Sequence, residues 1–280
     1  MRDYKRILTV QDISCVGQCS LTVALPVLSA CGHETCVLPT AVLSTHTGGF
    51  GRPEIVRFSG ELERFVEHWK KNDIAFDAVL VGYLGSTAAI CAAEEILTTM
   101  LAPGGVGIVD PAMADNGRLY SGFPEDYPEK IRRLCRKADV VLPNLTEAAI
   151  LSDQPWQDRT DETYGKALLD RLEMPRVILT GVGEDASGFL LREQGETRRY
   201  SHRRIPGSFS GTGDLFAATF TGLWLSGRGM YDSAVCAADF TCRCIRRTAA
   251  EPAHWYGLQF EPELPALTEL CGQGGRNVEK

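Results

Sequence analysis

Apolar runs alternate along the chain with segments of helical spacing. Residues 78–83 and 106–110 are continuous apolar runs, as expected of strands buried on both faces of a sheet. Residues 60–72 instead place Leu62 and Val66 on one helical face. The predicted strands are 5–10, 36–43, 78–83, 106–110, 139–142, 176–180 and a hairpin of 187–192 with 197–202. The predicted helices are 20–30, 60–72, 88–101, 129–136, 162–172, 214–225, 233–250 and 262–270.

This alternation predicts an α/β fold: a three-layer α/β/α sandwich with a central, mostly parallel sheet. No repeat, linker or break in composition divides the chain, so we expect one domain over residues 1–270 and a polar C-terminal tail over 271–280. Ligands of such sheets bind outside the carboxyl ends of the strands. Candidate chemistry is therefore expected just after the strand runs, where Asp12, Asp110 and Asn144 fall.

Charge and hydropathy narrow the class of protein. The net charge of −7 over 280 residues argues against a nucleic-acid-binding or anionic-membrane surface. No window of 18 uncharged apolar residues is present, so no membrane span is expected. The first ten residues have no apolar signal-peptide region, which favours a cytoplasmic protein.

The ten cysteines admit two interpretations. They lie mostly in apolar segments, and no CxxC pair occurs among them. A zinc site would need such ligand spacing, so we expect reduced thiols used as small core residues, without structural disulfide or zinc.

The stretch Gly211-Thr212-Gly213-Asp214 precedes an apolar helix. Two glycines and a helix N-terminus can direct backbone N–H groups at a phosphoryl group, and Asp214 could take a proton from an attacking hydroxyl. Alternatively, Asp214 merely caps the helix, because aspartate is common at helix starts. The residues alone leave both interpretations open.

Two further stretches carry carboxylates after strands. Asp110 and Asp115 suit Mg²⁺, although Asp-Asn-Gly at 115–117 is also strong turn chemistry. In residues 143–148, Thr146 or Asn144 could cap a short helix, with Glu147 as an acid of its first turn. Signatures of P-loop, dinucleotide-binding, zinc-protease and serine-hydrolase sites are absent from the sequence.

Six motifs in order resemble the ribokinase superfamily, and most of all its pyridoxal/pyridoxamine (vitamin B6) kinases. The motifs are VQDISCVGQCSL, STHTGGFG, VGYLGS, DPAMADNGRLY, LPNLTEA and GSFSGTGDLFAA. The resemblance covers the chain from Ile7 to about Leu270. It implies a ribokinase-like domain without a separate lid domain, ATP as phosphate donor, Mg²⁺, often a monovalent cation such as K⁺, and a homodimer.

The resemblance also implies roles for individual residues on the phosphate side. Asp214 matches the base that takes the proton of the substrate's 5′-hydroxyl, and Gly211, Thr212 and Gly213 match the anion hole. The Mg-ATP side comprises Asp110, Asn144 and Glu147, with Thr180 touching the phosphates. Glu147 and Asp110 are thereby metal candidates, together with Asp115 from its strand-end position.

On the vitamer side, Thr47 and Tyr83 match pocket residues, with Tyr83 against the ring. Asp12 stands where the best-known pyridoxal kinases carry Ser, which leaves the ranking of pyridoxal, pyridoxine and pyridoxamine open. Asp12 can accept from a protonated nitrogen or a hydroxyl more strongly than Ser. Ala114 replaces a glycine of the usual motif, so a shifted loop is expected there.

The predicted function is ATP-dependent phosphorylation of the 5′-hydroxyl of a B6 vitamer in pyridoxal 5′-phosphate salvage. One alternative is a hydroxymethylpyrimidine (phosphate) kinase, which shares the GTGD and NLTEA stretches. Another is a non-catalytic regulator that binds nucleotide or pyridoxal, although a pure binder needs no base. The expected partners are the vitamer and ATP, without nucleic acid or membrane.

Overall fold

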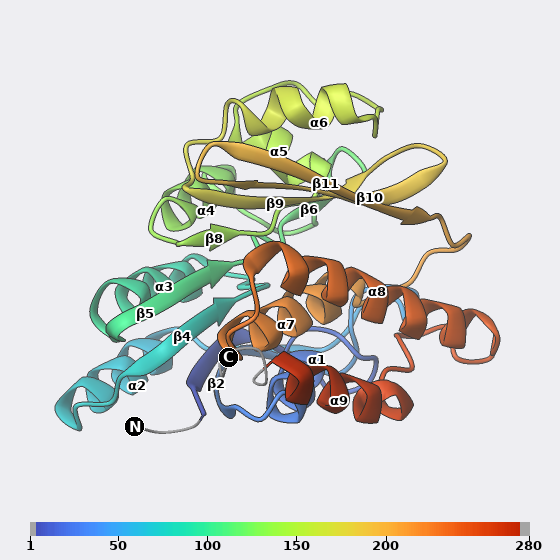
Figure 1. The fold of residues 1–280 in the computed structure, drawn as a ribbon. Coiled ribbons are helices and arrows are strands. Elements are labelled where there is room, and N and C mark those ends of the chain that lie inside the picture. Colours follow the sequence, from blue (N-terminus) through green and yellow to red (C-terminus); the bar gives the residue numbers. More distant parts are fainter. Residues whose placement is uncertain (1–3, 275–280) are drawn as a thin grey trace.

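The computed structural model describes residues 4–274, and within that range the chain forms one nine-stranded sheet between two layers of helices (Figure 1). The strands of this sheet are β1 (Arg6–Ser14), β2 (Glu34–Leu43), β3 (Ile55–Arg57), β4 (Phe76–Val81), β5 (Leu101–Val109), β8 (Val140–Val141), β9 (Arg176–Val182), β10 (Ala186–Glu193) and β11 (Glu196–Arg203). Their spatial order is β11-β10-β9-β8-β5-β4-β1-β2-β3.

The centre of the sheet is parallel and its edges are antiparallel. Strands β2, β1, β4, β5, β8 and β9 pair in parallel. The predicted hairpin, β10 with β11, extends one edge, and the short β3 closes the other edge antiparallel to β2. The expected mostly parallel sheet is therefore confirmed.

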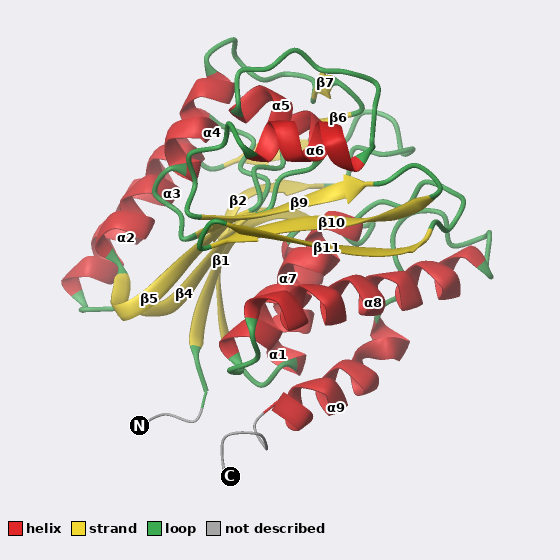
Figure 2. Ribbon diagram, turned by 45° about the horizontal axis from the view of Figure 1, so that its top comes forward, coloured by secondary structure: helices red, strands yellow, loops and turns green. Residues whose placement is uncertain are grey.

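The helices divide between the two faces, as Figure 2 shows. One face carries α2 (Gly60–Lys71), α3 (Thr87–Thr99), α4 (Tyr127–Cys135), α5 (Leu145–Leu151) and α6 (Glu162–Leu169). The other carries α1 (Leu21–Ala30), α7 (Thr212–Leu225), α8 (Met230–Ala249) and α9 (Leu264–Gly274). Each layer buries its own apolar cluster against the sheet, which confirms the three-layer α/β/α sandwich.

Several element boundaries differ from the predicted ones. Strand β1 continues four residues past Val10 through polar positions, because its backbone still pairs with β2 after a register shift between Gln11 and Ile13. Asp12 therefore lies inside the strand, not after it. Strand β5 begins at Leu101, in the segment where a helix was predicted to end.

At the C-terminus, α9 runs to Gly274, four residues into the predicted polar tail, because Leu270 and Cys271 still pack against the core. The helix thus extends past the predicted boundary at 271, and residues 275–280 of the predicted tail lie outside the described residues. Over residues 4–274, no helix has the length and apolar character needed to cross a membrane.

Candidate active site

The sheet reverses its winding beside β1. The chain leaves β1 through α1 on one face, whereas it reaches β4, the other neighbour of β1, through α2 on the opposite face. In open α/β sheets such a reversal leaves a crevice at the carboxyl ends of the strands. Asp12 lies inside β1 near its carboxyl end, Tyr83 follows β4 by two residues, and Asp110 follows the adjacent β5.

The glycine-rich turn before α7 has the geometry of an anion-binding site. Gly211 is the N-cap residue in the left-handed region, with φ 82° and ψ 6°, and a Cβ there would overlap the carbonyl oxygen of Gln18. Asp214 is the third residue of the helix. A glycine occupies the N-cap position, so Asp214 is an acid of the first turn and not the N-cap residue.

Asp214 stands among other acids at this helix start. Burial raises the pKa of Asp214, while the backbone N–H of Ser20 partly lowers it. The Asp110 Oδ2 atom lies 3.7 Å from the position that a Cβ on Gly213 would take. The structure thus brings Asp110 beside the Gly211–Gly213 turn, as expected of a phosphate site.

Asp12 is a buried carboxylate with an unused acceptor. Its side chain is 4% exposed, and its Oδ2 accepts from Ser14 Oγ at 3.4 Å. Among the described residues, its Oδ1 has no hydrogen-bond partner. Burial raises the pKa of Asp12 to about 6, a hydrogen bond from the Ser20 side chain lowers it in part, and the charge of Asp214 raises it further.

Glu147 fastens the loop that follows β5. Its Oε1 accepts from the backbone N–H groups of Met113 (3.0 Å) and Ala114 (3.4 Å), and its Oε2 accepts from that of Asn144 (2.9 Å). Burial raises the pKa of Glu147 to about 7, although these three hydrogen bonds oppose the shift. Burial, then the charges of Glu147 and Asp214, raise the pKa of Asp110 well above its usual value.

Asn144 has the predicted capping geometry. Its Oδ1 accepts from the N–H of Glu147 at 2.9 Å, which completes a capping box at the start of α5. Its Nδ2 donates to the carbonyl of Ala114 at 2.8 Å. Thr180 pairs with Asn144 in a parallel bridge, and its N–H donates to Pro143 O at 2.9 Å. Asn144 and Thr180 are therefore neighbours at the ends of β8 and β9.

The segment after Asp110 forms a small hairpin of β6 (Ala114–Asp115) and β7 (Arg118–Leu119). Asn116 and Gly117 have φ values of 49° and 74°, as a tight hairpin turn requires. Asp115 is exposed, and its carboxylate accepts from the backbone N–H (2.8 Å) and Nδ2 (3.0 Å) of Asn116. The turn interpretation of this stretch is confirmed.

Ala114 stands where the usual motif has a glycine, and its backbone is held by two neighbouring side chains. It is fully buried in β6 and is not among the residues with positive φ. Both its N–H and its carbonyl are bonded, to Glu147 and Asn144 respectively. An alanine fits here because the backbone has an ordinary conformation, which does not need glycine.

The predicted vitamer residues lie on separate loops. Tyr83 is half-buried, and its ring centroid is 5.9 Å from that of Phe123 and 6.5 Å from that of Tyr120. Burial and then the charge of Asp12 raise the pKa of Tyr83. Thr47 is exposed in the loop after β2.

Two site residues had no predicted role. Ser20 has a positive φ of 54° at the start of α1, a strained conformation for a non-glycine residue, and it contacts both Asp12 and Asp214. Tyr120 stands beside Tyr83 and near the acids of the phosphate side, which contribute after burial to its raised pKa. The sequence signal for Tyr120 is its place directly after the Asn-Gly hairpin; Ser20 carries none.

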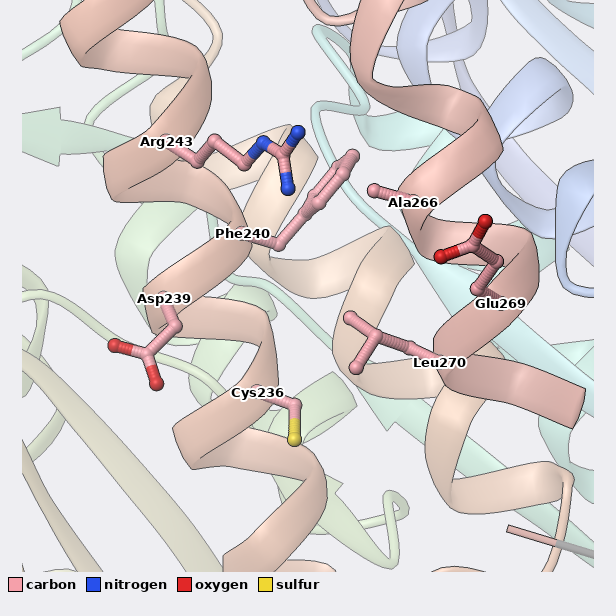
Figure 3. Close-up of a pocket in the computed structure, with 7 residues that line it drawn as sticks. All are labelled: Cys236, Asp239, Phe240, Arg243, Ala266, Glu269 and Leu270. Atoms are coloured by element: carbon pink, nitrogen blue, oxygen red, sulfur yellow. The ribbon is translucent and has the colours of Figure 1, made fainter. Parts of the chain in front are cut away.

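A surface hollow lies apart from these residues. A hollow of about 280 Å³ lies between α8 and α9, where Phe240 and Arg243 face Ala266 and Leu270 (Figure 3). It contains none of the residues predicted for catalysis.

Within residues 4–274, no three His, Cys, Asp or Glu side chains form a ready-made metal cluster, so Asp110, Asp115 and Glu147 are not gathered around one point.

Comparison with known proteins identifies similar chains. A family model described as phosphomethylpyrimidine kinase matches residues 59–258. The Arabidopsis thaliana pyridoxal kinase is 28% identical over 236 residues, which cover 79% of this chain and 74% of the relative. The human pyridoxal kinase is 26% identical over 244 residues, covering 78% of this chain and 77% of the relative.

Solved structures agree over nearly the full length. Pyridoxal kinase from Lactobacillus plantarum has a TM-score of 0.88 and 34% identity, covering 96% of this chain and 98% of that one. A candidate phosphomethylpyrimidine kinase from Bacteroides thetaiotaomicron, in a crystal form with pyridoxal, has a TM-score of 0.87 and 33% identity, covering 94% and 96%.

Proposed function

This chain belongs to the phosphomethylpyrimidine kinase family of the ribokinase superfamily, among its pyridoxal kinases, and from that premise we propose how it phosphorylates a B6 vitamer. The reaction moves the γ-phosphoryl group of ATP to the 5′-hydroxyl of the vitamer. The observation that carries the proposal is the position of Asp214, which lies beside the anion-binding turn without capping the helix.

Asp214 acts as the general base. Its carboxylate takes the proton of the 5′-hydroxyl while the hydroxyl oxygen forms a bond to the γ-phosphorus. The bond from that phosphorus to the β,γ-bridging oxygen breaks, and ADP leaves with the electron pair. The raised pKa of Asp214 supports this role, because a carboxylate in a buried, acidic setting binds a proton more readily.

The turn before α7 stabilises the negative charge that develops on the phosphoryl group during transfer. Backbone N–H groups of Gly211, Thr212 and Gly213 at a helix N-terminus offer donors that need no reorganisation during the reaction. A side chain at Gly211 would overlap Gln18, and the left-handed φ also favours glycine there. These features support an anion hole at this turn.

The residues fit Mg²⁺ without forming a closed cage. Asp110 offers Oδ2 beside the turn, and burial first, then the charges of Glu147 and Asp214, raise the pKa of this carboxyl group. Both oxygens of Glu147 already accept backbone N–H groups, so Glu147 would act on the ion through water. Bound Mg²⁺ neutralises phosphate charge. We expect excess EDTA to abolish turnover; full activity in EDTA would contradict a metal requirement.

The nucleotide and the vitamer are bound by residues of different segments. Asn144 and Thr180, adjacent at the ends of β8 and β9, belong to the ATP side. Tyr83 offers a ring face to the vitamer, Thr47 a hydroxyl, and Asp12 an unused buried oxygen that a substrate N–H or O–H would satisfy. A homodimer in the cytoplasm, with K⁺ as a second cation, completes the proposal.

A coupled ADP-release assay across pyridoxal, pyridoxine, pyridoxamine and hydroxymethylpyrimidine tests this function. Hydroxymethylpyrimidine is the second candidate substrate, because the matching family model is named for a phosphomethylpyrimidine kinase. We expect turnover with at least one B6 vitamer to exceed that with hydroxymethylpyrimidine. The reverse ranking would reassign the substrate, and absence of ADP release with all four compounds would favour a non-catalytic regulator.

A further inference from the structure

His46 is a buried histidine for which the proposed reaction has no step. It lies in the loop between β2 and β3, beside Thr47, and is 5% exposed. Its Nδ1 accepts from the backbone N–H of Gly48 at 2.9 Å, and its Nε2 is 3.0 Å from the carbonyl oxygen of Tyr256. Since an N–H can only donate and a carbonyl can only accept, the neutral Nε2–H tautomer is the form that satisfies both contacts.

These bonds join segments that are far apart in the chain. Tyr256 is 210 residues from His46, in the loop between α8 and α9. The ring of Phe50, in the same loop as His46, meets the His46 ring edge to face with 5.1 Å between centroids and lies tilted against the Trp255 ring at 4.6 Å. His46 therefore ties the loop that carries Thr47 to the segment 254–257.

The imidazole also supports the chain that packs on the anion hole. A Cβ on Gly17 would overlap the His46 ring, so the backbone of residue 17 rests directly on it. The next residue, Gln18, bridges to Gly257, and its carbonyl oxygen covers Gly211. On the other side, the Ser210 Oγ lies 3.2 Å from the position of a Cβ on Gly48.

From this arrangement we infer that His46 is a positioning residue that holds the vitamer-side loop 46–51 in register with the anion-binding turn 211–213. It touches neither turn glycine itself and acts through Gly17, Gln18 and Gly48. The inference rests on the proposed function for its kinetic consequence. Its structural content, the coupling between two loops and the turn, can be measured without turnover.

Two variants separate the two bonds. His46→Asn can place an acceptor near the position of Nδ1 and keep the bond from Gly48, but it is too short to reach Tyr256. His46→Gln can place a donor near the position of Nε2 and keep the bond to Tyr256. A matched control is His33, a second buried histidine whose Nε2 meets the carbonyl of Gly222 at 2.9 Å. Its Nδ1 accepts from the Lys5 N–H at 3.4 Å, at the opposite, amino-terminal end of β2.

The kinetic test compares kcat and KM for pyridoxal and for ATP. Small misplacement of reacting groups is costly, so we expect each His46 variant to lower kcat/KM for pyridoxal by about tenfold or more. The KM for ATP should stay within about twofold, because an anion hole acts mainly on the charge that develops in the transition state and less on bound ATP. We expect His33→Gln to lower thermal stability and to leave kcat and both KM values unchanged. A rise in the KM for ATP as large as the loss in kcat/KM for pyridoxal, or a matching loss in His33→Gln, would overturn the inference.

Backbone hydrogen exchange gives a readout independent of activity. We expect exchange in both His46 variants to accelerate in 46–51 and also in 15–19 and 208–213, whereas His33→Gln should leave these segments as they are. Faster exchange confined to residues 46–51 would contradict the inferred coupling between this loop and the turn 211–213. If the wild type releases no ADP with any substrate, the proposed kinase function fails, while the exchange result still decides the role of His46. ¹⁵N shifts of the imidazole should report a protonated Nε2 and an unprotonated Nδ1; the opposite tautomer would also contradict the inference.

Discussion

At the scale of single residues, the site concentrates negative charge. Asp12, Asp110, Glu147 and Asp214 all have raised pKa values, and burial is the largest cause for each. Uncompensated buried carboxylates are costly to a fold, and they are common where a protein must bind cations or move protons. In the proposed function, three of these side chains are aspartates with different roles: Asp214 is the base, Asp110 a metal ligand and Asp12 an acceptor for the substrate.

The role of Asp214 can be tested by a change that keeps its size. We expect Asp214→Asn to fold and bind nucleotide while kcat falls by about 10²–10⁴-fold, the usual contribution of a general base. Steady-state kinetics and nucleotide titration measure the two effects. Asp161 is a matched control, since its carboxylate does cap a helix by accepting from the Tyr164 N–H at 3.1 Å.

Asp161→Ala should cost about 1 kcal/mol of stability with turnover intact. Retention of more than about a tenth of wild-type turnover by Asp214→Asn would remove the general-base role, because that loss falls below the usual range.

Asp12 should make the unliganded protein less stable as pH rises. Its folded pKa is about 6, above the value of 3.8 for an unperturbed aspartate, so the folded state holds the proton more tightly than the unfolded state does. Stability from this group is therefore full below about pH 4 and is lost as pH rises through 6, by up to about 3 kcal/mol. Asp12→Asn cannot ionise. We expect the difference in unfolding free energy between variant and wild type to shift in favour of the variant from pH 4 to pH 8; a constant difference would refute this.

At the scale of elements, the helix start at α5 organises the loop after β5. The capping box of Asn144 and Glu147 does more than cap the N-terminus of α5, since the same two side chains also hydrogen bond to the backbone of Ala114. Thr146 adds a third contact by accepting from the Gly117 N–H at 3.0 Å. Asp110, at the head of this loop, is thereby held beside the anion-binding turn.

Changing Glu147 should loosen this loop. Glu147→Gln keeps one acceptor oxygen but turns an NH₂ group toward a backbone N–H, so a buried donor loses its partner. We expect stability to fall by about 1–3 kcal/mol and the Mg²⁺ concentration for half-maximal activity to rise. Urea unfolding and a Mg²⁺ titration measure the two effects. Ser86→Ala is a control, because Ser86 caps α3 by accepting from the Ala89 N–H. An equal change in Mg²⁺ dependence in both variants would contradict the special role of Glu147.

At the scale of the whole molecule, one sheet separates two apolar cores. The cysteines follow this division: Cys135 lies in the core under α2–α6, while Cys31 and Cys244 lie in the other. Burial raises the pKa of Cys135 and is the largest cause of the rise at Cys244, to about 12. All ten cysteines are free thiols in the structure.

Thiol counting tests the prediction that the protein has neither structural disulfide nor zinc. Under denaturing, non-reducing conditions we expect ten reactive thiols, because deeply buried thiols resist oxidation while the protein is folded. A loss of two would point to Cys31 and Cys271, which influence each other's pKa. A count of four or fewer would contradict the prediction. Reduced protein counted in parallel is the control.

The sequence by itself determined the layered α/β architecture and the location of the glycine-rich turn before α7. Both are local properties: a strand buried on two faces must be continuously apolar, and a glycine-rich turn before a helix exposes N–H groups in any fold. Asp214 and Asp110 could therefore be found from their neighbours in the chain. The edge strand β3 could not, because Ile55–Arg57 is too short and too exposed for a clear period.

Only the tertiary structure decided which partners these residues meet. The extension of β1 through Asp12 depends on pairing with β2, and the bond from His46 to Tyr256 depends on two loops 210 residues apart. Likewise, Glu147 accepts from the Met113 N–H in the loop after β5 only because β5 and β8 are adjacent in the sheet. Local spacing limits which side chains share a face of one element, whereas the order of strands in the sheet determines which elements meet.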